Sequence, residues 1–309
     1  MSAEGWTAFA PAKVNLFLHV GAAEGDGFHP LVSLAAFADV GDRLTARPAP
    51  AFSLTVEGPF ASALDDGVNL IERAADAWSG GGEPPRLAIT LDKRLPIAAG
   101  LGGGTSDGAA ALRLFAEAEG VTDAARLAAA AARLGSDGPA CLEARPVLMT
   151  GRGERLTPVR LPELFAVLAN PGLPCPTGAV YAAFDELAGA GQLEAPQFEG
   201  LDAPSVLDRL AEESRNDLEP AALAVQPAVG RVLARLAALP EARLTRMSGS
   251  GATCCALTRD LAAARVGAAR LAAEEPSWWV RACRLGDGTE AARVCRLADT
   301  SGNRTARPA

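Results

Sequence analysis

The stretch AGLGGGTSDGAA (residues 99–110) places four glycines ahead of two hydroxyl side chains, and it runs directly into an alanine-rich segment. A glycine-rich turn that leads into a helix lets backbone N–H groups approach an anion, and the helix dipole adds positive potential there. Glycines also occur in tight turns simply because such turns need a positive φ. The stretch alone therefore leaves two interpretations open, a phosphate-binding loop and an ordinary tight turn.

Two common phosphate loops do not match this stretch. Counted from Gly100, the dinucleotide-binding pattern GxGxxG would need a glycine where Thr105 stands. Counted from Gly103, a Walker A loop would need a lysine after Gly108, where the chain has Ala109. The sequence therefore disfavours a nicotinamide-dependent dehydrogenase and excludes a P-loop nucleotidase.

Length and composition indicate a globular protein of two domains. The chain has 309 residues, 49% of them hydrophobic and 21% charged, and this length exceeds what one hydrophobic core usually supports. The net charge of −8, with no basic block, argues against a general binder of nucleic acid or anionic membranes. No signal peptide and no long apolar run is found, so we expect a soluble cytoplasmic protein.

The cysteines do not form a recognisable metal pattern. Six cysteines occur without a CxxC pair, and the chain holds only two histidines. A zinc site would be poorly supplied with ligands. We therefore expect reduced cytosolic thiols and no bound metal among the site residues.

Strand and helix patterns alternate along the first half of the chain. The stretch TAFAPAKVNLFLHV (7–20) is rich in strand formers and alternates in part. Further strands are expected at 43–48, 52–58, 86–96, 138–151 and 154–161. Helices are expected at 70–78, 107–118 and 123–135, with Thr105 or Ser106 capping the second of them.

A new unit begins with PELFAVLANPG (162–172), so we expect a domain boundary near residue 160. Residues 1–160 would form the N-terminal domain and residues 161–297 the C-terminal domain, and the polar tail 298–309 should be disordered. In the second domain we expect helices at 178–189, 203–213, 219–238 and 259–274, and strands at 243–247, 253–257 and 278–285.

Three motifs, taken in order, resemble those of the GHMP kinases, the superfamily of galactokinase, homoserine kinase and mevalonate kinase. They are PAKVNLFLHV (11–20), LPIAAGLGGGTSDGAAAL (95–112) and SGSGATCCAL (248–257). Further stretches resemble the branch of this superfamily whose acceptor is a cytidine-diphosphate-linked methylerythritol. These are GDGFHPLVSL (25–34), GVNLI (67–71), LGSDGPACL (134–142), GRGERLTPV (151–159), NPGLPCPTGAVY (170–181) and RNDLEP (215–220).

The resemblance implies an α+β architecture, the two-domain GHMP kinase fold. Its N-terminal domain would be similar to ribosomal protein S5 domain 2 and its C-terminal domain ferredoxin-like, with the active site between them. The implied reaction is ATP-dependent phosphorylation of the 2-hydroxyl of the CDP-linked methylerythritol, in the non-mevalonate route to isoprenoid precursors. ATP with Mg²⁺ would be the cofactor, and the chain would act as a monomer or homodimer.

Two residues match the catalytic positions of the family. Asp137 would take the proton from the acceptor hydroxyl. Lys13 would keep the carboxylate of Asp137 ionised and could orient that carboxylate or the acceptor hydroxyl. Without the family match, Asp137 would be interpreted as a turn aspartate and Lys13 as an exposed strand lysine.

The remaining motif positions suggest two binding regions. The ATP side would consist of Gly100, Leu101, Gly102, Gly103, Gly104, Thr105, Ser106, Asn69, Leu70 and Lys93. The acceptor side would consist of Asn15, Phe28, His29, Thr177, Tyr181, Ser248 and Gly249, with the aromatic rings stacking on cytosine. Asp107, beside the anion site, could hold magnesium or cap the helix, and we favour the cap.

Three alternatives remain open at this point. The chain could be another GHMP kinase acting on mevalonate or homoserine, which would not need GDGFH or Tyr181. It could be a GHMP-fold protein that binds a ligand without catalysis, although the presence of both Lys13 and Asp137 counts against this. A nicotinamide dehydrogenase is the weakest alternative, because its fingerprint is missing.

Overall fold

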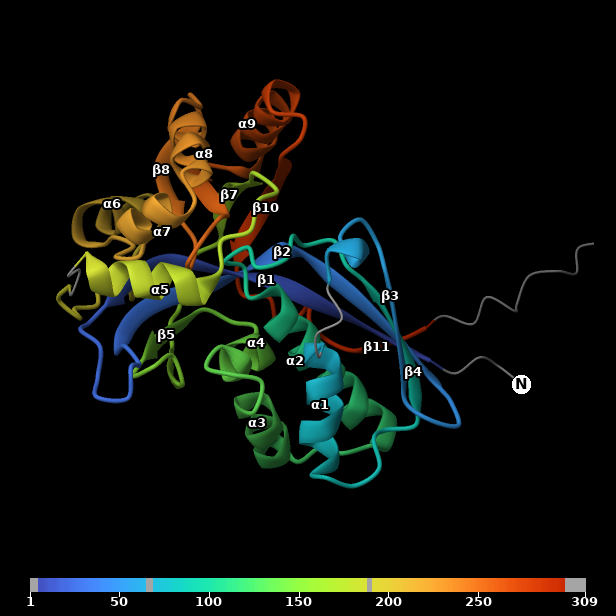
Figure 1. Ribbon diagram of the computed structural model, residues 1–309. Coiled ribbons are helices and arrows are strands. Elements are labelled where there is room, and N and C mark those ends of the chain that lie inside the picture. The colour runs from blue at the N-terminus through green and yellow to red at the C-terminus, as the bar shows by residue number, and fades with distance from the viewer. Residues whose placement is uncertain (1–4, 65–68, 188–190, 298–309) are drawn as a thin grey trace, which may run out of the picture.

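The computed structural model describes residues 5–64, 69–187 and 191–297. The tail at 298–309 and the end of the helix expected at 178–189 lie outside these residues. The described strands are β1 (Trp6–Val20), β2 (Leu31–Pro48), β3 (Ser53–Glu57), β4 (Leu87–Asp92), β5 (Val147–Thr150), β6 (Arg155–Pro158), β7 (Leu164–Asn170), β8 (Ala242–Met247), β9 (Cys254–Thr258), β10 (Trp279–Gly286) and β11 (Cys295–Arg296). The described helices are α1 (Leu70–Ser79), α2 (Gly103–Glu119), α3 (Ala124–Ala132), α4 (Gly138–Glu143), α5 (Thr177–Glu186), α6 (Ala203–Glu213), α7 (Glu219–Val225), α8 (Ala228–Ala237) and α9 (Leu261–Glu274) (Figure 1).

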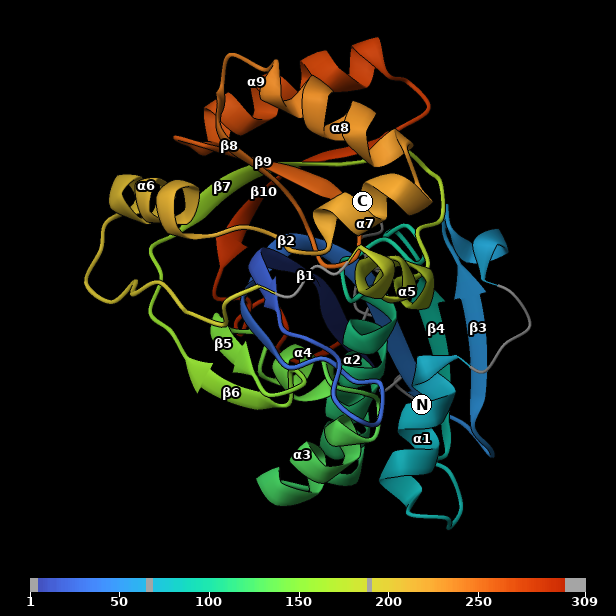
Figure 2. The same cartoon turned by 60° about the vertical axis from the view of Figure 1, so that its left-hand side comes forward.

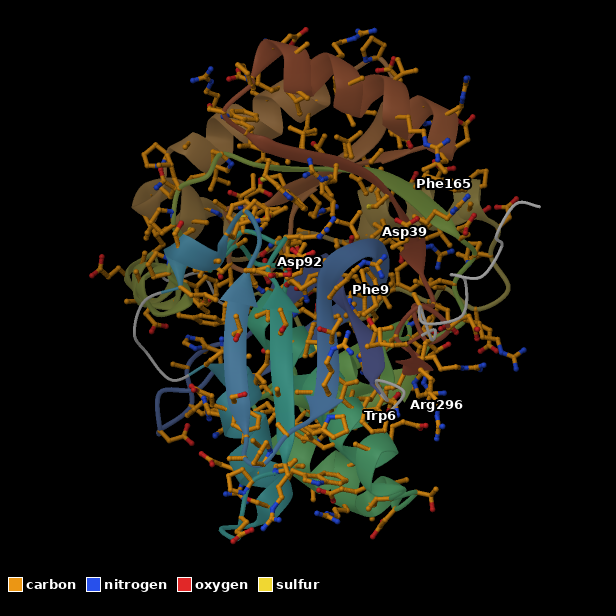
Figure 3. All side chains as sticks on the ribbon, turned by 90° about the vertical axis from the view of Figure 1, so that its right-hand side faces the viewer. Trp6, Phe9, Asp39, Asp92, Phe165 and Arg296 are labelled. Atoms are coloured by element: carbon orange, nitrogen blue, oxygen red, sulfur yellow. The ribbon has the colours of Figure 1, made fainter. Side chains whose placement is uncertain are left out.

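All described strands join one branched sheet. Its main path runs β11-β1-β2-β10-β7-β9-β8, while β4 and β5 also pair with β2, and β3 and β6 extend these two branches. One edge of the sheet is formed by β11, where Arg296 pairs with Trp6 of β1 (Figure 3). Because β2 is 18 residues long, it can pair with four neighbours along its length. The two halves of the chain therefore share one hydrogen-bonded framework.

Helices α1 to α4 cover one face of the N-terminal part of the sheet (Figure 1). Alanines on α2 allow it to approach β1 closely, and large side chains such as Phe115 and Trp78 fill the space toward α1. A Cβ atom on Gly108 would lie only 2.9 Å from the carbonyl oxygen of Leu70. The start of α2 is thus held firmly against the start of α1.

The C-terminal part places α8 and α9 over strands β7 to β9 (Figures 1 and 2). Their buried faces meet in a second core that includes Val167, Val232, Leu236 and Leu271. Strand β10 joins this layer to the N-terminal layer, since it pairs along β7 and, at its end, with β2. The arrangement confirms the expected α+β class.

Most expected elements are present, and three expectations were wrong. Residues 138–143 form the short helix α4 rather than strand, with Pro139 in its first turn. The helix expected at 219–238 is divided into α7 and α8, because Pro227 cannot donate a hydrogen bond within a continuous helix. Helix α2 begins at Gly103, four residues before the expected start, and its cap is described below with the site.

His19 of β1 joins the N-terminal sheet to the segments before and after α6. Its side chain is buried, Nδ1 lies 2.7 Å from the carbonyl oxygen of Glu194, and Nε2 accepts a hydrogen bond of 3.3 Å from the backbone N–H of Arg215. A neutral ring with its proton on Nδ1 satisfies both contacts. Burial and, to a lesser extent, the nearby Arg215 lower the pKa of His19.

This geometry predicts a pH-dependent stability. Since the pKa of His19 is lower in the native state than in the unfolded state, neutral His19 contributes fully to the free energy of unfolding above the unfolded pKa of about 6.5. This contribution is lost as pH falls toward the native pKa. We expect the free energy of unfolding of the wild type to fall between about pH 7.5 and 5.5, and His19→Gln to reduce this dependence. Denaturant titrations at both pH values test this, with His29 retained in both proteins. An unchanged pH dependence would contradict the role of His19.

Candidate active site

A cleft of about 770 Å³ lies where the two halves of the sheet meet the start of α2. Its walls come from β1, the β1–β2 connection, the glycine loop, the turn before α4, α5 and the loop after β8. In Figure 2 the ribbons of β1, β2, α2 and α5 run through the centre of the molecule. The motifs that lie far apart in the sequence therefore line one cleft.

The glycine loop presents backbone N–H groups to this cleft. Gly100 and Gly102 have φ values of +73° and +60°, and Gly102 is the N-cap of α2. A Cβ atom on Gly100 would collide with the carbonyl oxygen of Ser248, so a side chain cannot fit there. Gly103, Gly104 and Thr105 form the first turn of α2 and line the cleft. Because the first N–H groups of a helix lack partners within it, this turn can bind an anion.

The expected side-chain cap of α2 was wrong. Thr105 and Ser106 lie inside the helix, and no side chain caps it, because the left-handed conformation of Gly102 begins the helix instead. The hydroxyl of Ser106 is buried and donates to the carbonyl oxygen of Pro11 at 2.8 Å. Leu101 is buried in the core, and neither it nor Ser106 lines the cleft. Both residues support the loop from behind.

Asp107 does not cap the helix either. It lies in α2, where Oδ2 accepts a hydrogen bond of 2.6 Å from Nζ of Lys93, and the same ammonium group donates to Oδ2 of Asp42 at 2.6 Å. All three side chains are buried. Burial raises the pKa of Asp107 well above its usual value. Burial opposes the charged form of Lys93, but the two carboxylates outweigh this effect and raise its pKa. The trio forms a charged cluster beneath the glycine loop.

Lys13 and Asp137 form an ion pair at the other side of the glycine loop. Nζ of Lys13 lies 2.7 Å from Oδ2 of Asp137, and the lysine side chain is 7% exposed while the aspartate is 34% exposed. A Cβ atom on Gly102 would lie 3.8 Å from that same carboxylate oxygen. Asp137 immediately precedes α4, whose Gly138 packs so closely on α3 that a Cβ atom would collide with the carbonyl oxygen of Ala131. The carboxylate is therefore rigidly placed and open to the cleft.

Asn15 and Ser248 connect β1 to the glycine loop. The hydroxyl of Ser248 accepts from the backbone N–H of Asn15 at 3.1 Å and donates to the carbonyl oxygen of Gly100 at 2.8 Å. Ser248 is buried and does not line the cleft, whereas Asn15 and Gly249 do. The amide nitrogen of Asn15 donates to Ser33, but its Oδ1 is buried without a partner among the described residues. That oxygen is available to accept a hydrogen bond from a ligand.

Phe28, His29, Thr177 and Tyr181 meet at the far end of the cleft. The rings of His29 and Tyr181 lie 5.0 Å apart, and Nε2 of His29 lies 2.7 Å from Oδ1 of Asp185. Burial raises the pKa of Tyr181 to about 12, with a smaller effect from the nearby Asp137. Phe28 is 55% exposed, so one large ring stands at the rim of the cleft. The sequence-predicted aromatic residues are thus gathered around one end.

Asn69 and Leu70 lie at the opposite end, where they line the cleft beside Gly104. Asn69 has a second task, because its Oδ1 accepts from the backbone N–H of Ile71 and its own N–H donates to Glu72. This capping box begins α1. A residue of the predicted nucleotide wall therefore also defines a helix end.

One residue of the site was missed at the level of sequence. Arg152, to which the sequence assigned no role, lines the cleft. Ser250 of the SGSGA loop was expected at the cleft; it lines the cleft and is hydrogen-bonded to Thr177 at 2.8 Å. A compositional signal was also available: of 29 basic residues only Lys13 and Lys93 are lysines, and both are buried at the cleft. Lysine differs from arginine in that its ammonium group is compact and acts as a point charge, so two lysines among so many arginines mark positions where this geometry matters.

The described residues contain no cluster of three or more His, Cys, Asp or Glu side chains that could hold a metal ion. The six cysteines are free thiols, and only Cys295 is exposed. None of the helices within the described ranges combines the length and apolar character needed to cross a membrane.

Comparisons with known proteins agree with the geometry of the cleft. Residues 69–144 match the family described as GHMP kinases N terminal domain, and residues 196–276 match GHMP kinases C terminal. The chain is 51% identical over 289 residues, or 90% of its length, to a protein of Caulobacter vibrioides (strain NA1000 / CB15N) named 4-diphosphocytidyl-2-C-methyl-D-erythritol kinase, 99% of which is covered.

Two solved structures extend this likeness. A crystal structure of 4-(cytidine 5'-diphospho)-2C-methyl-D-erythritol kinase matches with a TM-score of 0.71 and 35% identity, over 91% of this chain and 99% of that one. Homoserine kinase from Cytophaga hutchinsonii ATCC 33406 matches with a TM-score of 0.66 over 95% of this chain and 97% of that one. Its identity of 17% supports a shared fold alone.

Proposed function

This chain belongs to the 4-diphosphocytidyl-2-C-methyl-D-erythritol kinases, a family of GHMP kinases, and we propose that it transfers the terminal phosphoryl group of ATP to the 2-hydroxyl of 4-diphosphocytidyl-2-C-methyl-D-erythritol. The observation that carries the proposal is the Lys13–Asp137 pair, 2.7 Å apart, beside the N–H groups of the glycine loop. Phosphoryl transfer to an alcohol needs such a base beside a cradle for phosphates.

In this proposal Asp137 accepts the proton of the acceptor hydroxyl. Its carboxylate is partly exposed to the cleft and is fixed by Lys13, which also neutralises its charge. Lys13 is held in turn by β1, whose backbone N–H at Lys13 donates to the carbonyl oxygen of Leu101 at 2.8 Å. The base and the phosphate loop are thereby kept in one fixed relation, as a reaction between two bound substrates requires.

ATP would lie along the glycine loop with its base toward Asn69, Leu70 and the Lys93 segment. The cradle fits a triphosphate because glycines keep side chains away from the first turn of α2. We propose that Mg²⁺ accompanies ATP and offsets the charge of its phosphates. Oδ1 of Asp107, buried at the cleft without a hydrogen-bond partner among the described residues, is a carboxylate oxygen of the kind that Mg²⁺ binds.

The acceptor would place its cytosine at the aromatic end of the cleft. Phe28 and Tyr181 offer ring faces. The ring of His29 is already oriented, because its Nε2 is hydrogen-bonded to Asp185. Asn15 and Gly249 lie between this end and Asp137, where they would contact the methylerythritol part. Ser248 would act from behind, by joining Asn15 to Gly100.

The wider organisation of the chain is part of the same proposal. We infer a boundary near residue 160, which is supported by the two family matches on either side of it. We further propose a cytoplasmic enzyme that acts on a small molecule, as a monomer or a homodimer. Light scattering on the purified protein distinguishes these two states.

The test is ADP release by the purified protein with Mg-ATP and each of three acceptors. We expect turnover with 4-diphosphocytidyl-2-C-methyl-D-erythritol and none above background with mevalonate or homoserine. Turnover with one of the latter two would favour another GHMP kinase activity. Binding of the cytidine compound without ADP release would favour a ligand-binding protein.

A further inference from the structure

Arg152 lies in the turn between β5 and β6 and lines the cleft beside Phe28, yet the proposed transfer gives it no task. Its Nη2 atom lies 2.7 Å from Oε2 of Glu24 and 2.6 Å from Oδ2 of Asp26. Its guanidinium carbon lies 4.6 Å from the centroid of the Phe28 ring. One side chain therefore makes three contacts with the connection between β1 and β2.

This connection has few other supports. A hydrogen bond between Gly21 and Pro30 closes its base, and bonds among residues 24–28 shape its tip. Of the hydrogen bonds, ion pairs and ring contacts that the structure describes, those that reach residues 24–28 from outside the connection all come from Arg152. The placement of the exposed Phe28 ring thus depends on this arginine.

The turn that carries Arg152 is anchored to the sheet. The backbone N–H of Arg152 donates to Glu154 at 2.6 Å, and the carbonyl oxygen of the adjacent Gly151 accepts from Leu31 at 2.7 Å. Strand β5, which leads into the turn, pairs with β2. The backbone of Arg152 is therefore anchored to the sheet, and its side chain reaches from there to the connection.

We propose that Arg152 is a positioning residue for the acceptor: it packs on one face of Phe28 and ties down Glu24 and Asp26, so that the ring offers its other face to the pyrimidine. This rests on the proposed function, since it assumes a base at the aromatic end of the cleft. A cation on one ring face and an aromatic base on the other is a favourable arrangement for the phenyl ring. Without the arginine, two neighbouring carboxylates would repel each other and loosen the connection.

The test compares Arg152→Met with Arg155→Met in steady-state kinetics. Arg155 lies on β6, its side chain is 79% exposed, and it does not line the cleft, so its loss serves as the matched control. We expect Arg152→Met to raise the KM for the cytidine acceptor about 5- to 20-fold, while kcat and the KM for ATP change less than about twofold. Arg152→Lys should recover part of the loss, because it keeps a cation near both carboxylates.

A double variant separates positioning from direct contact. If Arg152 acts through Phe28, then Arg152→Met combined with Phe28→Ala should raise the acceptor KM no further than Phe28→Ala alone. Additive effects, an acceptor KM equal to that of the Arg155→Met control, or a change mainly in the KM for ATP would each overturn the proposal. A wild type without turnover on the cytidine acceptor would instead refute the proposed function. Melting temperatures of all variants check that the fold is intact.

Discussion

Replacing Asp137 by Asn is expected to lower kcat by about 10²- to 10⁴-fold, because it removes the group that, in the proposed mechanism, accepts the proton of the acceptor hydroxyl. An amide has nearly the same shape as a carboxylate but cannot take up this proton. Lys13 would keep a hydrogen-bond acceptor in place of the carboxylate oxygen now 2.7 Å away. We therefore expect the KM values for ATP and for the acceptor to change much less than kcat.

The matched control for this variant is Glu143→Gln. Glu143 ends α4, the helix that Asp137 precedes, pairs with Arg145 at the surface and does not line the cleft. It undergoes the same acid-to-amide change, so it reports the general effect of losing a charge from this helix. ADP release under saturating substrates measures both variants. A kcat for Asp137→Asn equal to that of the control would show that another group is the base.

Replacing Lys93 by Met is expected to lower the free energy of unfolding by about 3–5 kcal/mol, the usual cost of removing one partner from a buried ion pair. The Lys93 side chain is only 3% exposed and its ammonium group separates Asp42 from Asp107. Without it, two buried carboxylates face each other beneath the glycine loop. The backbone of Lys93 should stay in place, since it is bonded to Glu57 and Phe60.

A second substitution tests whether charge is the cause. Adding Asp107→Asn to Lys93→Met leaves one buried carboxylate, Asp42, whose Oδ1 accepts from the backbone N–H groups of Arg94 and Leu95. We expect this double variant to be more stable than Lys93→Met alone. Urea titrations of the three proteins measure the difference, and a double variant with lower stability would exclude charge repulsion as the cause.

The stability of Lys93→Met should also depend on pH in a defined direction. Burial already raises the native pKa of Asp107 above its unfolded value, so the native state holds its proton over a pH range in which the unfolded state has lost it. Stability is therefore lost as pH rises through this range. Lys93 lowers the pKa of Asp107, so removing the lysine cation raises this pKa further and extends to higher pH the range over which stability is lost. We expect the deficit of Lys93→Met relative to the wild type to be larger at about pH 8 than at about pH 5.

Local features of the fold could be predicted because their causes lie within a few residues. Asn69 and Asp123 cap the helices that follow them through bonds to backbone groups two or three positions away. The start of α2 shows the limit of this reasoning. Two hydroxyl residues suggested a side-chain cap, yet the helix begins at Gly103, after the left-handed Gly102. The hydroxyl of Ser106 lies inside the helix and donates to Pro11 of β1 instead.

In the candidate site, too, local motifs could be predicted from the sequence, whereas contacts between distant residues could not. From the sequence alone, the order of the motifs indicated the glycine loop, Lys13 and Asp137 as separate members of the site, and the aromatic residues, because each motif is a short stretch that can be recognised by itself. That Lys13 and Asp137 form an ion pair is seen only in the structure. The sequence could not show that Lys93 lies between Asp42 and Asp107, or that Arg152 packs on Phe28. These contacts join residues 14 to 124 positions apart.

What the sequence determined by itself was therefore the chemistry: the residue types that phosphoryl transfer needs, in stretches that carry their own turns and helix starts. What only the tertiary structure decided was which buried charges neutralise one another and which side chains hold the loops in place. The physical reason is that a local hydrogen bond depends on a few backbone angles. A buried ion pair or a ring contact exists only after the sheet has brought distant segments together and removed the water between them.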